Sequence, residues 1–397
     1  TTRTSSAGNS WQSITYGNGV FVAVAINGVN NSIMRSTDAI TWSTSTTALN
    51  GLWSSVTYGN GIFVAVAATT SLNSVITSTD GNTWTVQAGT TTNSWSAVTY
   101  GNGMYVAVGV SGRCVTSPDG ITWTARVPAI DSIWISVCWS PELRLFCAVS
   151  NSGTGNRVMT SPDGITWASR TSAADNQWTS VCWSSELKLF CAVSLDGAGN
   201  RVMTSPDGIT WTSRTSAVDN SWLSICWSSE LKLFCAVSST GSADRVMTSA
   251  DGITWASRTS AADNNWSSVC WSPELGIFTS VAFSGTDNRA MTNLSMYSNI
   301  PTMTVTGNVV ANNIANSLYI QNSNTSINAN KDVSELYVYN SDTLPTTKSG
   351  LTIHQDSTTA DAHLQLNSYG TKNTIGIDTS DGYKFKISRG PFTDTNP

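Results

Sequence analysis

Hydrophobic residues recur along the first three quarters of the chain as pairs of short runs, each pair separated by a polar turn. Residues 134–149 contain one such pair. If two strands pair symmetrically about this turn, Trp139 faces Phe146 on one side of the sheet, and Cys138 faces Cys147 on the other. Both faces are then apolar, so the sheet needs cover on both sides.

This pair of runs belongs to a unit that occurs seven times. Each unit begins with a Trp, and a third short run follows a loop of Gly, Asn and Ser. In most units a turn with the sequence Ser-X-Asp-Gly-X-Thr-Trp then leads into a fourth run. The leading residues, at spacings of 39 to 44, are Trp11, Trp53, Trp95, Trp134, Trp178, Trp222 and Trp266. This period, with four short strands per unit, is typical of a β-propeller blade.

The N-terminus is predicted to complete the seventh unit. That unit lacks a fourth run, because residues 293–295 replace the Asp-Gly turn and no Thr-Trp follows. Residues 2–11 match residues 169–178, which include the fourth strand of an earlier unit, almost position for position. We therefore expect residues 2–5 to form the outer strand of the blade that contains Trp266, which would remove an open sheet edge.

The predicted fold is all-β. Residues 1–292 form a seven-bladed β-propeller closed by the N-terminal strand, and all 17 Trp and all 8 Cys lie in this region. Residues 293–397 are rich in Asn, Ser and Thr, with short alternating strand patterns such as residues 335–339 and 383–387. Because these strands have few apolar residues to bury, we expect a β-rich, fibre-type region that completes its core as a homotrimer.

The cysteines repeat one pair of positions in three units. The pairs are Cys138 with Cys147, Cys182 with Cys191, and Cys226 with Cys235. Thr and Val occupy these positions in the first three units, which indicates a site for a small buried hydrophobe such as a free Cys. Directly opposed cysteines also suit a cross-strand disulfide, so this alternative stays open although we favour reduced thiols. The sequence has no CxxC or His-Cys spacing for zinc, and we predict no metal and no cofactor.

Charge and hydropathy argue against two classes of partner. The formal net charge is −5, only 11% of the residues are charged, and no basic run occurs, which argues against nucleic-acid binding. No apolar run approaches the ~20 residues of a membrane span, and we find no signal peptide. We therefore expect neither nucleic-acid binding nor membrane insertion.

The Asp-Gly motif is first of all a turn. The Asp can hydrogen-bond the backbone two residues on, and the Gly supplies a positive φ. The six aspartates are Asp38, Asp80, Asp119, Asp163, Asp207 and Asp251; Ala39 follows Asp38, and Gly follows the other five. The motif resembles the Asp-box repeats of sialidases and related propellers, although the familiar box has a residue between Asp and Gly. In that family the box is a structural turn away from the catalytic centre, so the resemblance implies a fold and no activity.

A sialidase-like active site is not evident in the repeats. Sialidases use an arginine cluster, a Tyr nucleophile with a Glu partner and an Asp acid, each from a different blade. Here the polar residues follow the repeat instead, as in the series Arg157, Arg201, Arg245 and Arg289, and the propeller region has no His. No set of nucleophile, base and orienting group emerges. We expect no enzymatic activity and keep a glycan-cleaving hydrolase as an alternative.

Three units place an Asp-Asn pair and a Trp together where one blade leads into the next. Asp and Asn suit sugar hydroxyls, and an indole suits the flat face of a sugar ring. The layout is similar to that of propeller lectins, which bind a glycan between adjacent blades. The candidate glycan residues are Asp175, Asn176, Trp178, Asp219, Asn220, Trp222, Asp263, Asn264 and Trp266. The structural alternative is that the Trp packs the blade and the Asp-Asn pair shapes a turn.

The C-terminal region narrows the functional hypothesis. Residues 350–355, 363–368, 374–378 and 383–388 resemble shaft segments of trimeric phage and large-virus fibres. Such segments often precede a self-cleaving chaperone, and both ends of the chain are compatible with trimming. The resemblance implies a homotrimer on the virion surface or outside the cell, with other virion components as partners. The leading hypothesis is a non-enzymatic fibre protein that binds a host cell-surface glycan or receptor; the alternative is a structural appendage or cell-surface protein without a ligand.

Overall fold

The computed structural model of the chain describes residues 1–28, 30–45, 52–69, 74–87, 93–293, 362–368, 371–378 and 384–389. The chain divides into two units, Thr1–Met303 and Thr304–Pro397. All regular structure in the described residues is β-strand, as the sequence predicts. None of these residues lies in a helix that could cross a membrane.

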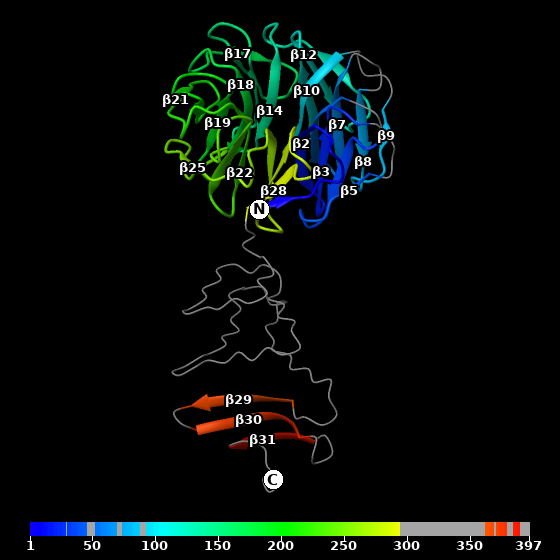
Figure 1. Ribbon diagram of the computed structural model, residues 1–397, viewed down its shortest axis with the longest axis vertical. Helices are drawn as coiled ribbons and strands as arrows, with labels where there is room; N and C mark the ends of the chain where they lie inside the picture. Colours follow the sequence, from blue (N-terminus) through cyan, green and yellow to red (C-terminus); the bar gives the residue numbers. More distant parts are fainter. Residues whose placement is uncertain are drawn as a thin grey trace. The chain divides into compact units, whose positions relative to one another are not determined.

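The first unit consists of repeated four-stranded antiparallel sheets, as in a β-propeller (Figure 1). Two of these sheets are joined where β7 pairs with β10. In chain order the strands of the first four repeats are β2 to β5 (Trp11–Gly17, Val20–Ala25, Ile33–Ser36, Ser43–Thr44), β6 to β9 (Trp53–Gly59, Ile62–Thr69, Val75–Ser78, Thr85–Val86), β10 to β13 (Asn93–Gly101, Met104–Gly109, Arg113–Ser117, Thr124–Arg126) and β14 to β17 (Trp134–Ser140, Leu145–Ser150, Val158–Ser161, Ala168–Arg170). Those of the last three are β18 to β21 (Trp178–Ser184, Leu189–Ser194, Val202–Ser205, Thr212–Arg214), β22 to β25 (Trp222–Ser228, Leu233–Ser238, Val246–Ser249, Ala256–Arg258) and β26 to β28 (Trp266–Ser272, Ile277–Ala282, Ala290–Thr292) with β1 (Thr2–Arg3).

The strand register follows the hydrophobic pattern. Between β14 and β15, Trp139 pairs with Phe146 and Cys138 pairs with Cys147, which confirms the predicted pairing. The first pair of each repeat is interrupted directly after the leading Trp, where the register shifts by one residue; in β14 this residue is Ile135. Such a β-bulge leaves one residue outside the pairing.

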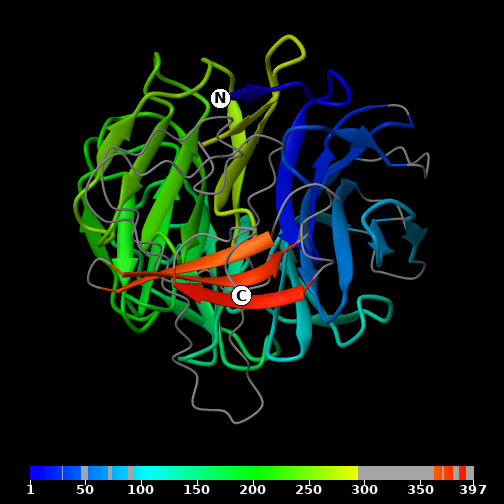
Figure 2. The ribbon, with the colours of Figure 1, turned by 90° about the horizontal axis from the view of Figure 1, so that it is seen from below.

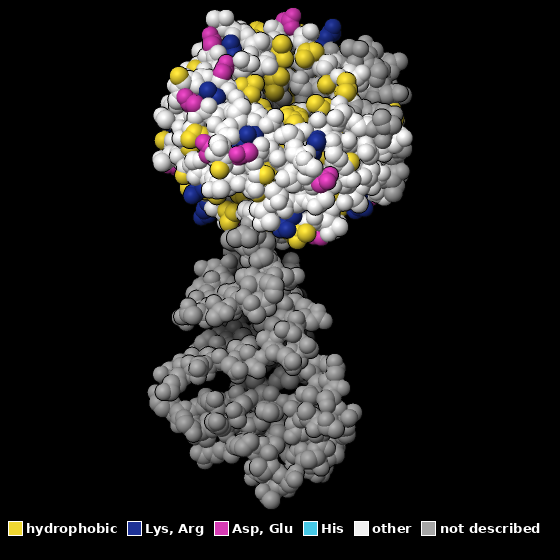
Figure 3. Space-filling view, in the orientation of Figure 1, with side chains coloured by type: hydrophobic (Ala, Val, Ile, Leu, Met, Phe, Trp, Pro, Cys, Tyr) yellow, Lys and Arg dark blue, Asp and Glu magenta, His cyan; other side chains and the backbone are white. Residues whose placement is uncertain are grey.

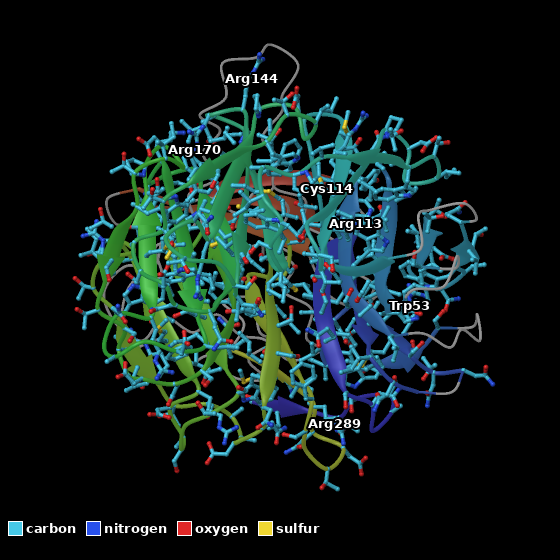
Figure 4. All side chains as sticks on the ribbon, turned by 90° about the horizontal axis from the view of Figure 1, so that it is seen from above. Trp53, Arg113, Cys114, Arg144, Arg170 and Arg289 are labelled. Atoms are coloured by element: carbon cyan, nitrogen blue, oxygen red, sulfur yellow. The ribbon has the colours of Figure 1, made fainter. Side chains whose placement is uncertain are left out.

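The N-terminus supplies the fourth strand of the last sheet. β1 pairs with β28, so that Thr2 lies opposite Met291 and Arg3 opposite Ala290 (Figure 1, Figure 2). The Thr1 ammonium group donates to the Thr292 carbonyl at 2.8 Å. Arg289, which lies near the N-terminal strand in Figure 4, donates from Nη1 to the carbonyl of Asn9 at 2.7 Å. These contacts join residues nearly 300 positions apart in the chain.

The hydrophobic core lies between neighbouring sheets. The first strands of the repeats lie toward the middle of this unit, and the short fourth strands lie at its rim (Figure 1). One cluster combines Cys191 and Val193 of β19 with Trp222, Phe234 and Met247 of the next sheet. Hydrophobic side chains also gather around a hollow near the middle of the face in Figure 3. Each sheet therefore has cover on both faces, as its two apolar faces require.

The Asp-Gly segments form tight turns with a shared geometry. Asp163 Oδ1 accepts the backbone N–H groups of Ile165 and Thr166, both at 2.8 Å, and Gly164 has a φ of 72°. Burial alone would raise the pKa of Asp163, but the two backbone hydrogen bonds outweigh it and hold the pKa below its usual value. The indole N–H of Trp167 donates to the Gly164 carbonyl at 3.0 Å. The same Asp hydrogen bonds occur at Asp38, Asp80, Asp119, Asp207 and Asp251.

The second unit contains one described sheet. It is three-stranded and antiparallel, in the order β29 (Ala362–Ser368), β30 (Thr371–Asp378) and β31 (Lys384–Arg389). These strands coincide with three of the fibre-like segments in the sequence. The predicted strand at residues 335–339 and the fibre-like segment at residues 350–355 lie outside the described residues.

Candidate functional site

The three candidate glycan tryptophans are buried inside the sheets. Trp178, Trp222 and Trp266 have no exposed surface. The Trp178 indole N–H donates to the Ala174 carbonyl at 3.1 Å, and the other two make the equivalent bond. A sugar ring cannot stack on an indole that the protein covers completely, so this part of the predicted site is wrong and the packing alternative holds.

The asparagines beside them are also structural. Asn176 is 7% exposed, and its Nδ2 donates to the Asn200 carbonyl at 2.8 Å, in the loop between β19 and β20. Asn220 and Asn264 make the same bond to the corresponding loops of the next repeats, at 3.0 and 2.8 Å. Each Asn therefore holds the loop of the following sheet and has little surface for a ligand.

The aspartates accept hydrogen bonds from the loop of the preceding sheet, and their side chains stay partly exposed. Asp175 Oδ1 accepts the Gly155 N–H at 2.6 Å and lies 3.8 Å from Arg157 Nε. Its side chain is 44% exposed, and those of Asp219 and Asp263, which make equivalent contacts, are 48% exposed. Only the aspartates of the predicted site therefore remain accessible to a ligand.

A cavity of about 460 Å³ lies where the first strands of all seven repeats meet. In most repeats two residues contribute to its wall: the bulge residue after the leading Trp, and the residue that follows the second strand. The apolar members are Ile26, Val110, Ile135, Leu195, Leu223 and Phe283, all of them half-buried. A concave site with several apolar groups is the usual form of a ligand pocket. We call this site the central mouth.

Serine hydroxyls line much of the wall of the central mouth. Ser136 Oγ accepts the Val181 N–H of the next sheet at 3.2 Å, and Ser224 Oγ accepts the Val269 N–H at 3.1 Å. The same contact is made by Ser13, Ser55, Ser180 and Ser268. Each hydroxyl that accepts in this way still has a proton to donate. Because no residue of the described lining is charged, the site suits an uncharged ligand.

Repeats that are otherwise nearly identical differ at the central mouth. The second strands β15, β19 and β23 all have the sequence LFCAVS, and the third strands β16, β20 and β24 all have VMTS. The bulge residues of these repeats are Ile135, Thr179 and Leu223. The residues that follow the second strand are Asn151, Leu195 and Ser239, of which Asn151 and Leu195 line the cavity. A constant scaffold with variable residues around one cavity is the arrangement of a recognition surface.

The sequence prediction rested on residues that the repeats have in common, so it missed these variable residues. Because the bulge residue lies outside the strand pairing, its side chain has no cross-strand partner that would fix its type. A comparison of the three most similar repeats, position by position, contains the signal. The positions at which all three repeats differ from one another are the bulge residue, the residue after the second strand and three loop positions near them, whereas other positions differ in only one repeat.

The described residues show no metal-binding cluster and no activated thiol. In that part of the chain, no group of three or more His, Cys, Asp and Glu side chains could hold a metal ion. One of the two histidines, His363, lies in β29, and the other, His354, lies outside the described residues. The buried thiols are poor nucleophiles, because burial raises the pKa of Cys114 and of Cys235 to about 12.

Comparisons with known proteins support the fold. No protein-family model matches the chain, and no curated protein matches its sequence. The chain is similar to the solved structure of YCF48 bound to D1 peptide, with a TM-score of 0.55 and 16% identity over 72% of this chain and 92% of that chain. It is also similar to YCF48 from Cyanidioschyzon merolae, with a TM-score of 0.54 and 14% identity over 72% and 95% of the two chains. Both are β-propellers, and at this identity the likeness concerns the fold alone.

Proposed function

We propose that this chain is a non-enzymatic binding protein, the head of a viral or phage fibre that recognises host surface glycans at the central mouth. The observation that carries the proposal is the divergence of nearly identical repeats around one cavity. The partly exposed Asp175, Asp219 and Asp263 lie outside this cavity and would make peripheral contacts. Weak contacts of this kind gain strength when several heads act together on one surface.

The chemistry of the central mouth favours a neutral sugar. Its described lining combines serine hydroxyls with apolar side chains such as Leu195 and Phe283 and has no charged group. Hydroxyls can bond sugar hydroxyls, and the apolar side chains can cover a methyl or N-acetyl group. An acidic sugar would lose its hydration without gaining a cationic partner, so we expect neutral, acetylated or deoxy sugars to bind best.

A second candidate ligand is an extended peptide with an apolar side chain. The apolar wall of the central mouth suits such a side chain as well as it suits a methyl group. The similar solved structure of YCF48 holds a D1 peptide, which supports peptide binding as a use of this fold. The two candidates differ in what competes for binding: a free neutral sugar for one, an apolar peptide for the other.

We further propose that the first unit is a seven-bladed ring closed at the sheet that contains β1. Contacts between the first and last repeats support it. Ser267 Oγ donates to the Trp11 carbonyl at 2.5 Å, and Ser268 Oγ accepts the Ile14 N–H at 3.2 Å. These bonds repeat those between other neighbouring sheets, such as Thr179 Oγ1 to the Trp222 carbonyl at 2.7 Å.

A glycan array with the full chain and two variants tests the proposed function. Leu195→Asp places a charge in the central mouth and should reduce binding to neutral glycans at least about tenfold. The matched control is Ile209→Asp, which changes a 50% exposed apolar residue at the opposite end of the same sheet and should leave binding intact. Binding to peptides but not glycans would favour the second candidate. Equal binding by both variants, or no binding to either class, would overturn the site.

A further inference from the structure

In each of the last four repeats an arginine directly precedes the third strand, and in three of them a carboxylate lies beside it. Arg157 Nε lies 3.8 Å from Asp175 Oδ1, and the same oxygen accepts the Gly155 N–H at 2.6 Å. The equivalent groups in the next two repeats are Arg201, Asp219 and the Gly199 N–H, then Arg245, Asp263 and the Ala243 N–H. Each of these sites therefore binds a carboxylate between one guanidinium group and one backbone N–H.

The fourth arginine, Arg289 (Figure 4), has a glycine where the others have an aspartate. Residues 2–11 match residues 169–178, which places Gly8 at the position of Asp175. The loop around Gly8 follows the same path as its counterparts, since the Trp11 indole N–H donates to the Ala7 carbonyl at 3.3 Å. Trp178, Trp222 and Trp266 make the same bond. The glycine thus removes the carboxylate and leaves the loop unchanged.

Arg289 is held in place by carbonyl groups alone. Its Nε donates to the Gly285 carbonyl at 2.8 Å, and its Nη1 donates to the carbonyls of Phe283 and Asn9 at 2.9 and 2.7 Å. A guanidinium group has five N–H donors, and the two on Nη2 have no acceptor among the described residues. None of the ion pairs in that part of the chain includes Arg289. This half-buried cation therefore keeps two donors for an anion.

The space beside Arg289 is open to a carboxylate. A Cβ atom built on Gly8 would lie 4.0 Å from Arg289 Nη2, with no closer contact. Gly8 does not have a positive φ, so its backbone conformation does not require a glycine. The Asp287 N–H, which corresponds to the Gly155 N–H, has no acceptor among the described residues. The exposed Asp287 carboxylate makes no ion pair with Arg289, so both donors stay available.

We propose that Arg289 Nη2 and the Asp287 N–H, beside Gly8, form a binding site for the carboxylate group of an external ligand. A guanidinium edge and a carboxylate match each other in shape and charge. A half-buried guanidinium also attracts an anion more strongly than one in bulk water, because the local dielectric constant is lower. None of these three residues lines the central mouth, so the proposal does not depend on glycan binding there.

The site lies at one end of the strand pair β1 and β28. The Ser5 N–H donates to the Asp287 carbonyl at 3.1 Å at this end, before β28 begins. Thr1 lies at the other end, where it bonds Thr292. The groups that form the site therefore all lie inside the described part of the chain, away from Thr1.

The test is saturation-transfer NMR of the full chain with sodium acetate, with the ionic strength held constant by sodium chloride. Gly8→Asp supplies a carboxylate from within the chain and should weaken the acetate signal at least about threefold, because a tethered group has a high effective concentration. The matched control Gly8→Ala adds only the Cβ atom and should keep the signal. Equal acetate signals from the wild type and Gly8→Asp, or an equal loss in both variants, would overturn the site.

Stability provides a second readout that needs no dissolved ligand. At low salt the Tm of Gly8→Asp should exceed that of Gly8→Asn, a variant of the same size without the charge, by about 1–3 °C. The difference should shrink in about 1 M sodium chloride, which screens exposed charges beyond about 3 Å. If Gly8→Asn is as stable as Gly8→Asp at low salt, the guanidinium does not receive a carboxylate at this position and the proposal fails.

Discussion

At the scale of single residues, burial decides the chemistry of the cysteines. Opposed cysteines such as Cys182 and Cys191 suit either a disulfide or two small buried thiols, so the sequence alone left both open. In the structure all eight cysteines are free. Burial raises the pKa of the Cys182 thiol well above its usual value, and the same holds for the other seven. These side chains therefore act as small hydrophobic residues in the core.

The double substitution Cys182→Thr with Cys191→Val should cost less than ~1.5 kcal/mol of unfolding free energy. The reason is that the first repeats already contain this pair in the same register, as Thr15 opposite Val22. Chemical denaturation of the full chain measures the cost, and thiol titration of the unfolded wild type should find eight groups. A loss in the range of ~2–4 kcal/mol, typical of a removed disulfide, or a clearly lower thiol count would contradict the prediction.

The tryptophans mark the limit of what residue type can predict. The same residue packs a blade or stacks on a sugar, and the sequence around Trp178 is compatible with both. The outcome depends on whether the surrounding residues cover the indole, and at Trp178 they do, with the indole N–H bonded to the Ala174 carbonyl. That contact is set by the path of the preceding loop, which the hydrophobic pattern does not encode.

At the scale of strands, the pattern of hydrophobic residues predicted which residues pair across the sheet. It did not predict the β-bulges. The first strand of each repeat loses its pairing for one residue after the leading Trp, as at Ile135 in β14. The bulge turns the next residue toward the neighbouring sheet, where its serine hydroxyl accepts a backbone N–H, as Ser136 does from Val181. A strict period of two contains no signal for this extra residue, so the central mouth was missed although the strands were found.

One position in this series of serine contacts is an alanine. Ala97 stands where the other repeats have serine, so the N–H of Val137 receives no hydroxyl from this neighbour. Ala97→Ser should stabilise the chain by about 0.5–1.5 kcal/mol, because it adds one hydrogen bond at a largely buried site. The midpoint of urea denaturation measures the gain.

The matched comparison is Ser136→Ala, which removes the corresponding bond to Val181. It should destabilise the chain by about 1–3 kcal/mol, since a buried N–H loses its partner. If Ala97→Ser lowers stability, or if Ser136→Ala has no effect, the serine contacts do not help to hold neighbouring sheets together.

At the scale of the whole molecule, the two units differ in how far their sequence repeats. In the first unit each sheet is covered by its neighbours, and the N-terminal strand completes the last sheet. Repetition made this unit predictable, because seven copies of one pattern reinforce a single interpretation. The second unit has no such repetition, and its functional assignment depends on a resemblance of short segments.

The described sheet of the second unit aligns apolar residues at paired positions. Leu364 pairs with Ile375, and Ile375 pairs with Ile387, across all three strands. A sheet of three strands needs a covering layer to bury such residues. Association of identical chains would provide that layer, and it would also bring several central mouths to one surface, where weak binding is multiplied.

We therefore predict that the full chain is a homotrimer in solution. Light scattering should give three times the 42.1 kDa mass of one chain, with no change on moderate dilution. Leu364→Asp should shift the mass toward that of one chain, because a charge at this paired position opposes burial between copies. The control Ile209→Asp, at an exposed position of the first unit, should remain trimeric. A monomeric wild-type chain whose β29 to β31 amides are protected from hydrogen exchange would refute the prediction, since the sheet would then be stable without partners.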